Sequence, residues 1–234
     1  MSQKLPKELI KELDELSVQL TKGTPEERDV AMSRLGEYEK SGTISIDVLM
    51  DMAGHVDPSL RMYAIMALGR NGSARAVRKL QEMAQELDTG NVLLLETVVD
   101  ALGQTGDKEV IPLLLSLLGI QTKGWTSRLL GRLGKRKDEP SREQLRRRDH
   151  LTLPVIRALE KIPDAQAAEL LGEYLEHDDP FVRWHTIQIL VKTNFGGYND
   201  SLKRMAESDQ NNLVREMAEI ALQKIQGLPP HMNN

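Results

Sequence analysis

The chain contains no cysteine, which excludes disulfide bonds, thiolate metal sites and a cysteine nucleophile. Aromatic residues make up only 3% of it, so a core must consist mainly of Leu, Ile, Val, Ala and the 10 Met, which suit closely packed helices. No apolar run approaches the roughly 20 residues that span a bilayer. No basic stretch leads into an apolar core at the N-terminus, as it would in a secretory signal. We therefore expect a cytoplasmic protein without a transmembrane segment.

Residues 57–72, DPSLRMYAIMALGRNG, form the clearest structural unit of the sequence. Asp57 suits a helix cap, and Pro58 suits the first helical position because its missing N–H needs no partner there. Apolar residues then recur at helical spacing and two glycines close the segment. These residues are Leu60, Ala64, Ile65, Ala67, Leu68, Gly69 and Gly72. The stretch predicts one amphipathic helix with a defined start and end.

This pattern returns along the chain. Matching segments lie at 28–36 (an offset of 33 residues), at 101–103 (an offset of 34) and at 179–183, and a last, shortened copy begins at Leu213. A second helix is expected in each interval, for example from Ala165 to Glu176 in the fourth copy. Two helices in every 31 to 34 residues indicate a solenoid, in which each unit buries its apolar face against its neighbours.

The motif of Asp-Pro, Leu-Arg, Ala-Leu-Gly and a closing Gly resembles a HEAT repeat, in particular the short repeats first associated with phycobilisome lyases. The resemblance covers about Thr24 to Gly227 apart from one interruption. It implies an all-α fold: a right-handed α-solenoid (HEAT-like superhelix) of about five to six helical-hairpin repeats. Members of that superfamily mostly scaffold other proteins, while a minority attach bilins, hydroxylate through paired His-Glu motifs or bind damaged DNA. No His-Glu dipeptide occurs in this chain, so the hydroxylase interpretation lacks its ligands.

The expected organisation has five parts. They are an N-terminal capping helix at 1–23, repeats 1 to 3 at 24–118, a basic insertion at 119–150, repeats 4 to 6 at 151–226 and a disordered tail at 227–234.

The insertion stands out by its spacing and its charge. Between Ala101 and Ala158 the repeat distance rises from 34 to 57 residues, so about 23 extra residues lie within 119–150. Ten basic and four acidic residues give this segment a charge of +6, whereas the other 21 basic and 31 acidic residues give the rest of the chain −10. The net charge of −4 therefore hides a polarised molecule.

Two surfaces are predicted to bind a partner. Insertions often map to the binding face of a repeat array, and an apolar stripe interleaved with arginines suits an acidic protein, nucleic acid or an anionic membrane surface. Second helices normally line the concave groove. The predicted partner-binding residues are Arg75, Arg78, Lys79, Trp125, Arg128, Arg132, Lys135, Arg136, Lys137, Arg146, Arg147 and Arg148. An equal alternative is that the insertion packs on the apolar helix at 110–118 with Trp125 as anchor, and both roles can coexist.

The remaining candidates favour structural roles. His177 and His185 are possible metal ligands, but Asp179 reads as a helix cap and His177 as part of the turn before it. One arginine recurs at the same repeat position and is predicted to join neighbouring repeats by pairing with cap aspartates such as Asp57 and Asp179. These arginines are Arg28, Arg61, Arg183 and Arg215. The glycines at 131 and 134 fit neither a phosphate loop nor a GXXG clamp. No catalytic residue, metal or cofactor is predicted.

The sequence thus predicts a non-catalytic protein–protein interaction scaffold or adaptor that uses the concave groove and the basic insertion. The alternatives are a nucleic-acid-binding HEAT-repeat protein and a phycobilin-lyase-like chaperone subunit.

Overall fold

The structure, a computed structural model, describes residues 7–86, 91–120 and 142–226. These residues form twelve α-helices and two short 3₁₀ helices and contain no strand, so the fold is an all-α solenoid. The chain divides into two compact units, Met1–Thr105 (unit 1) and Gly106–Asn234 (unit 2), each described by itself. The predicted tail at 227–234 lies outside the described residues.

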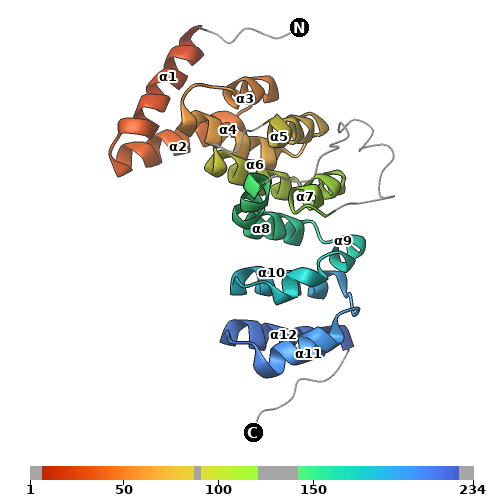
Figure 1. Ribbon diagram of the computed structural model, residues 1–234. Helices are drawn as coiled ribbons and strands as arrows, with labels where there is room; N and C mark the ends of the chain where they lie inside the picture. The colour runs from red at the N-terminus through yellow and green to blue at the C-terminus, as the bar shows by residue number, and fades with distance from the viewer. Residues whose placement is uncertain (1–6, 87–90, 121–141, 227–234) are drawn as a thin grey trace. The chain divides into compact units, whose positions relative to one another are not determined.

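Unit 1 contains a single helix followed by two complete helix pairs and one further first helix (Figure 1). The helices are α1 (Lys7–Lys22), α2 (Pro25–Lys40), α3 (Ile46–Met52), α4 (Pro58–Asn71), α5 (Ala74–Glu86) and α6 (Val92–Gln104). Helix α1 packs against α2 and α4 and buries Leu13 and Leu16. It thus covers apolar surface of the first repeats.

Helix α4 follows the expected chemistry of the repeat. The Asp57 carboxylate accepts hydrogen bonds from the backbone N–H groups of Ser59 and Leu60, Pro58 occupies the first turn, and Gly72 ends the helix in the left-handed conformation at φ +58°. Gly69 does not close the helix as expected but lies within it. A Cβ atom at Gly69 would lie 2.8 Å from the Ala101 backbone, so this glycine permits close packing of α4 on α6.

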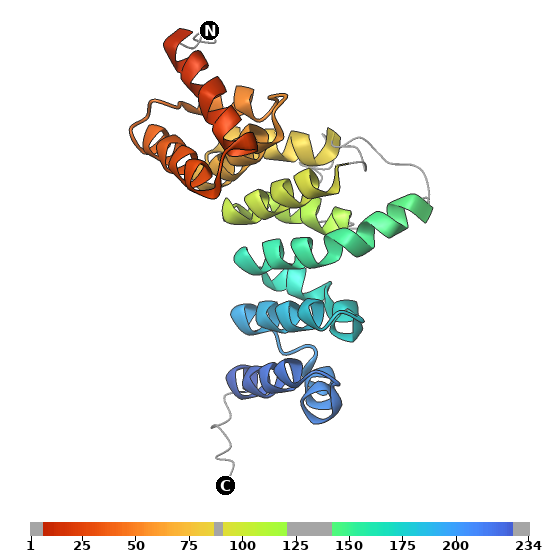
Figure 2. The ribbon, with the colours of Figure 1, turned by 90° about the vertical axis from the view of Figure 1, so that its left-hand side faces the viewer.

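Unit 2 contains η1 (Lys108–Val110), α7 (Ile111–Leu117), α8 (Arg142–Lys161), α9 (Ala165–Glu169), η2 (Gly172–Glu176), α10 (Pro180–Thr193), α11 (Asn199–Ser208) and α12 (Asn212–Gln226). The first helices α8, α10 and α12 stack in one column, and the second helices lie along one side of it (Figure 2). The column buries small and branched side chains such as Val155, Ile156, Ile187 and Ala218. A continuous apolar core of this kind is what a repeat array requires.

Helix α8 crosses the boundary expected between the basic insertion and the fourth repeat. It runs from Arg142 to Lys161, so the predicted boundary at residue 150 falls within it. It contains no glycine, and it continues through Pro154. The apolar helix α7 packs against α8 and η1.

The second helix of the fourth repeat differs from the prediction. Instead of one helix from Ala165 to Glu176, the structure has α9 and then the 3₁₀ helix η2. The hydroxyl of Tyr198 donates a hydrogen bond to the Glu169 carbonyl, and a Cβ atom at Gly172 would fall on the Tyr198 ring. The contact with Tyr198 therefore lies at the point where the helix breaks.

None of the helices in the described ranges is long and apolar enough to cross a membrane.

Candidate functional site

The predicted groove residues Arg75, Arg78 and Lys79 all lie on the second helix α5. Arg75 of α5 forms an ion pair with Asp47 of α3, in the preceding repeat. Both side chains are about half exposed, so the pair contributes little to stability. Arg78 is exposed and Lys79 is half-buried. The structure thus places the three predicted cations of α5 on one short helix, one of them bound to its neighbour.

Unit 2 has corresponding links between its second helices. Arg204 of α11 lies 3.2 Å from Glu176 of η2, at the same separation of 28 residues as Arg75 and Asp47. Lys108 lies 3.3 Å from Asp164, the cap of α9. The second helices of unit 2 therefore carry charged side chains of both signs. Two further charged residues beside these pairs, Glu173 and Lys203, are exposed.

Tyr174 of η2 is buried and does not line the second-helix surface beside Glu173. It is 9% exposed and its hydroxyl lies 3.5 Å from the Leu118 carbonyl. Because a 3₁₀ helix has three residues per turn, Tyr174 in η2 points in a different direction from the one that a continuous α-helix would give it.

Most of the predicted insertion residues are not among those that the structure describes. Trp125, Arg128, Arg132, Lys135, Arg136 and Lys137 lie outside the described ranges. Arg146, Arg147 and Arg148 are on α8, but their side chains also lie outside the described part of the chain.

The turns before the first helices are built alike. The cap Asp57 donates its backbone N–H to Nδ1 of His55 at 3.0 Å, and Asp179 does the same to His177 at 3.0 Å. In the last copy Asp209 takes the place of His177 and accepts from the N–H of the cap Asn211 at 2.9 Å. His177 is therefore part of the turn, and its Nδ1 is occupied by a backbone donor.

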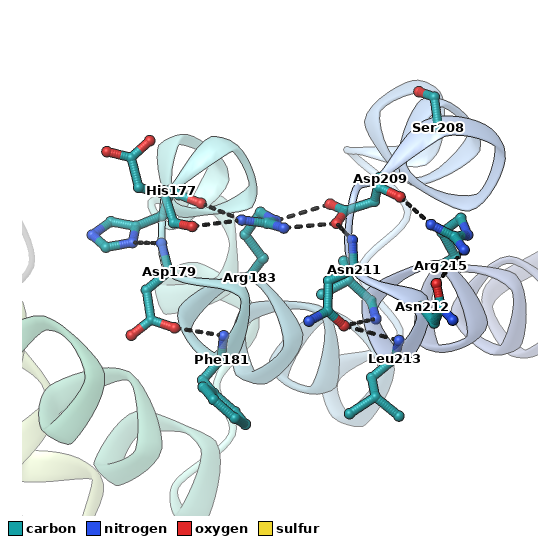
Figure 3. Close-up of polar contacts among 12 residues, drawn as sticks. His177, Asp179, Phe181, Arg183, Ser208, Asp209, Asn211, Asn212, Leu213 and Arg215 are labelled. Atoms are coloured by element: carbon teal, nitrogen blue, oxygen red, sulfur yellow. Dashed lines mark hydrogen bonds and ion pairs between the residues drawn. The ribbon is translucent and has the colours of Figure 1, made fainter.

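Arg183 joins two successive turns (Figure 3). Its Nε and Nη2 lie 2.8 and 2.6 Å from the two carboxylate oxygens of Asp209, and its Nη1 donates to the carbonyls of His177 and Asp178 at 2.7 and 3.0 Å. Both side chains are largely buried, at 13% and 7% exposure. Such a bidentate, charge-assisted pair fixes the relative register of the two repeats.

The observed partner of Arg183 corrects the predicted pairing. Arg183 binds Asp209 of the following turn, while the cap Asp179 accepts from the N–H of Phe181. Asp57 likewise binds Thr21 and its own helix N-terminus. Arg215 repeats the contacts of Arg183 within its own turn, since it donates to the Asp209 carbonyl and to Asn212 (Figure 3).

Burial by itself raises the pKa of the Asp209 carboxyl. The hydrogen bonds from the Arg183 guanidinium and the Asn211 N–H outweigh this effect and hold that pKa below its usual value. Asp209 is therefore a carboxylate at neutral pH, as the ion pair requires.

A second column of contacts joins the first helices and was not predicted. In unit 1 the Glu39 carboxylate accepts from the Tyr63 hydroxyl at 3.0 Å and pairs with Arg70 at 2.6 Å. In unit 2 Glu160 contacts His185 at 2.5 Å and Lys192 at 2.7 Å.

The two clusters occupy equivalent positions. Tyr63 and Arg70 lie six and thirteen residues after the cap Asp57, as His185 and Lys192 do after Asp179. This shared spacing from the cap aspartate is the sequence feature from which the two clusters could have been predicted. Burial raises the pKa of the Glu160 carboxyl, but the hydrogen bonds from His185 and Lys192 outweigh burial and lower it overall.

An open groove of about 550 Å³ lies between the turn at 176–183 and the end of α11. Its lining includes Glu176, Arg183, Arg204, Ser208 and Asp209. The Ser208 hydroxyl donates to the Arg204 carbonyl at 2.8 Å, so no base among the described lining residues activates it as a nucleophile. Within the described ranges, no group of three His, Asp or Glu side chains is placed to hold a metal ion. The groove offers hydrogen-bonding groups and charge of both signs.

The comparisons with known proteins concern the repeats. The family model for HEAT repeats matches residues 46–126 and 152–223, more than half of the chain. No match was found among the curated proteins. Among the solved structures, the crystal structure of an engineered protein has 16% sequence identity and a TM-score of 0.47, covering 92% of this chain and 97% of that chain. By the extent of the family match, the chain belongs to the HEAT-repeat family.

Proposed function

We propose that this HEAT-repeat protein is a non-catalytic interaction scaffold or adaptor. The proposal rests on the contacts that the polar side chains of the described residues make. Groups that catalysis would need, such as His177, His185 and Ser208, are bound to backbone or to neighbouring repeats. The second helices instead expose charged side chains of both signs, which suits a protein ligand better than a polyanion. A cytoplasmic location stays a prediction from the sequence.

In this proposal the partner lies in the groove lined by the second helices and meets the basic segment at 119–150. The +6 charge of that segment and the cations of α5 favour a partner with an acidic surface. Arg78 of α5 is exposed, as are Lys203 and Arg204 of α11, so each unit contributes cations to its own second-helix surface.

The test is quantitative affinity capture from the source cell. We expect the R75A/R78A/K79A variant to retain less of the captured protein than wild type, at an unchanged melting temperature. A matched control removes three exposed cations from α1 and α2, as K11A/K22A/K40A, and should capture as wild type does. Equal capture by the α5 variant and wild type would contradict the groove assignment.

A second proposal is that the basic segment binds nucleic acid, which its charge of +6 also favours. Binding to generic duplex and single-stranded nucleic acid is measured at two salt concentrations. Steep salt dependence that is lost in R146A/R147A/R148A would support this alternative, because phosphate contacts release counterions. Absence of binding at low salt would remove it.

The resemblance to the repeats of phycobilisome lyases supports a third, narrower proposal, a phycobilin-lyase-like chaperone subunit. It predicts a change in visible absorbance when the protein is mixed with a tetrapyrrole. An unchanged spectrum would eliminate this role and leave the scaffold proposal intact.

A further inference from the structure

Two first helices of unit 2, α10 and α12, share one row of exposed and half-buried residues. In α10 and α12 the residues two, five, nine and thirteen positions after the cap lie on one helix face, because spacings of three and four residues repeat every turn. These are Phe181, Trp184, Gln188 and Lys192 in α10, and Leu213, Glu216, Ile220 and Lys224 in α12. The opposite faces are buried, by Thr186 and Leu190 in α10 and by Ala218 in α12. We call the two rows the outer surface of unit 2.

Large apolar side chains are exposed on this outer surface. Phe181 and Leu213 are each 58% exposed, and Ile220 is 42% exposed. Phe181 and Leu213 project to the same side of their helices (Figure 3). Trp184 is half-buried, with its ring edge-on to His185 at 4.8 Å between centroids. Aromatic residues make up only 3% of the chain, and two of them lie on this surface. Clustered exposed apolar groups of this kind mark interaction sites, and Trp is enriched among the residues that dominate binding energy.

The far end of the outer surface is basic. Lys192 and Lys224 end their rows, and the equivalent row of α8 carries Arg157 and Lys161. Against these four cations the rows of α10 and α12 contain one carboxylate, Glu216. Lys192 is partly neutralised by its contact with Glu160 at 2.7 Å, and Lys161 also has a partner within the chain. Arg157 and Lys224 are exposed. The helix dipole accounts for a cation at the end of each helix, but not for Arg157 or for the aromatic side chains.

The same positions in unit 1 have a different character. In α2 they carry Glu26, Asp29, Ser33 and Glu37, and in α6 Leu93, Glu96, Asp100 and Gln104. Helix α4 is intermediate, with Ser59, Met62, Met66 and Arg70 at these positions. The repeat therefore forms without an aromatic residue at these positions and, in α2 and α6, without a cation, so the aromatic and basic pattern of unit 2 calls for another explanation.

We propose that the outer surface of unit 2 is a docking site for an amphipathic helix of another protein, whose apolar side chains lie beside carboxylates. The apolar anchors contact Phe181, Trp184 and Leu213, and the carboxylates face the cations at the other end. This inference rests on the proposed scaffold function and adds to it a second surface, distinct from the second-helix groove, and the chemical class of its partner.

The probe is a fluorescein-labelled synthetic helix with Leu and Phe at positions i, i+3, i+4 and i+7 and Glu along one flank. Two control peptides replace Glu by Lys, or Leu and Phe by Ser. Fluorescence anisotropy should show at least tenfold tighter binding of the acidic peptide to wild-type protein than of either control. Failure of the acidic peptide to bind, or equal binding of the Lys peptide, would overturn the proposal.

Variants locate the site. We expect F181S/L213S to weaken binding at least tenfold, and L93S, which alters an exposed residue at the same repeat position in unit 1, to leave it unchanged. R157E/K224E should shift the preference toward the Lys peptide, and it serves as the test if F181S/L213S does not fold. Undiminished binding to F181S/L213S together with an unchanged preference in R157E/K224E would overturn the assignment.

The same peptide separates this inference from the groove proposal. R75A/R78A/K79A should bind the peptide as wild type does. Loss of peptide binding in that variant alone would overturn the docking site on the outer surface while supporting the second-helix groove. Peptide binding that is lost in F181S/L213S, with no protein captured through the groove, would support the docking site on the outer surface and contradict the groove proposal.

Discussion

Arg183 and Asp209, 26 residues apart in the sequence, form a two-bond ion pair between successive repeats, with distances of 2.8 and 2.6 Å. The same guanidinium holds two carbonyls of its own turn. One side chain thus ties the turn before α10 to the turn before α12.

Removing Asp209 should destabilise unit 2. In D209A the guanidinium of Arg183 stays largely buried without its carboxylate, which we expect to lower the free energy of unfolding by about 2–4 kcal/mol. Urea denaturation followed by circular dichroism measures this. The control D200A removes an exposed carboxylate 3.5 Å from Lys203 and should leave the denaturation midpoint unchanged. Equal midpoints for D209A and wild type would show that the pair does not stabilise the array.

Stability should depend on pH through the same carboxylate. The pKa of Asp209 is lowered in the folded protein, so the unfolded chain binds more protons, and stability rises with pH across the titration. We expect the contribution of Asp209 to be complete above about pH 5 and lost as the pH falls through its folded pKa, below the ordinary value of about 3.9. Denaturation at a series of pH values compares wild type with D209N. A D209N profile as steep as that of wild type would contradict this origin of the acid sensitivity.

Two glycines at the same repeat position should respond in opposite ways to alanine. A Cβ atom at Gly69 would lie 2.8 Å from the backbone of Ala101, so G69A must push α4 from α6 and should destabilise by about 1–3 kcal/mol. Gly36 lies at the matching position of α2, and a Cβ atom added there would have no neighbour within 4 Å. G36A should therefore stabilise by about 0.5–1 kcal/mol through helix propensity. Thermal melts of both variants decide the matter, and shifts of the same sign would be inconsistent with close packing at Gly69.

Glu160 should be shared by His185 and Lys192. In E160Q the charge of Lys192 loses its carboxylate at 2.7 Å and the contact with His185 is weakened. We expect a loss of about 1–2 kcal/mol, since the site is only partly buried. A double-mutant cycle of E160Q with K192M measures the coupling between the two side chains. A coupling energy of zero would show that this pair is only a surface contact.

Local features of the fold were predictable from the sequence. The cap Asp57, Pro58 and the apolar spacing of α4 act within one helix, so short-range rules suffice for them. Features that depend on neighbouring repeats were harder to predict. Arg183 was predicted to link neighbouring repeats, but its partner Asp209 becomes apparent only when two turns are stacked.

The fourth repeat shows the same limit. The break after α9 lies where the chain contacts Tyr198, 29 residues beyond Glu169, and Tyr174 is buried after it. Within residues 165–176 only Gly172 weakens the expected helix, and its contact with Tyr198 depends on the next repeat. The candidate site was also only partly predictable. The cations of α5 could be located from the sequence. The ion pair of Arg75 with Asp47 and the cluster around Glu160 could not, because they depend on how the repeats pack.

The most direct test of the scaffold function is affinity capture with both predicted binding surfaces altered at once. The variant R75A/R78A/K79A/R146A/R147A/R148A is compared with wild type at equal protein concentration, with circular dichroism to confirm folding. We expect an unchanged spectrum and melting temperature and a loss of the captured partner. A folded variant that captures the same partner in the same amount would contradict this expectation.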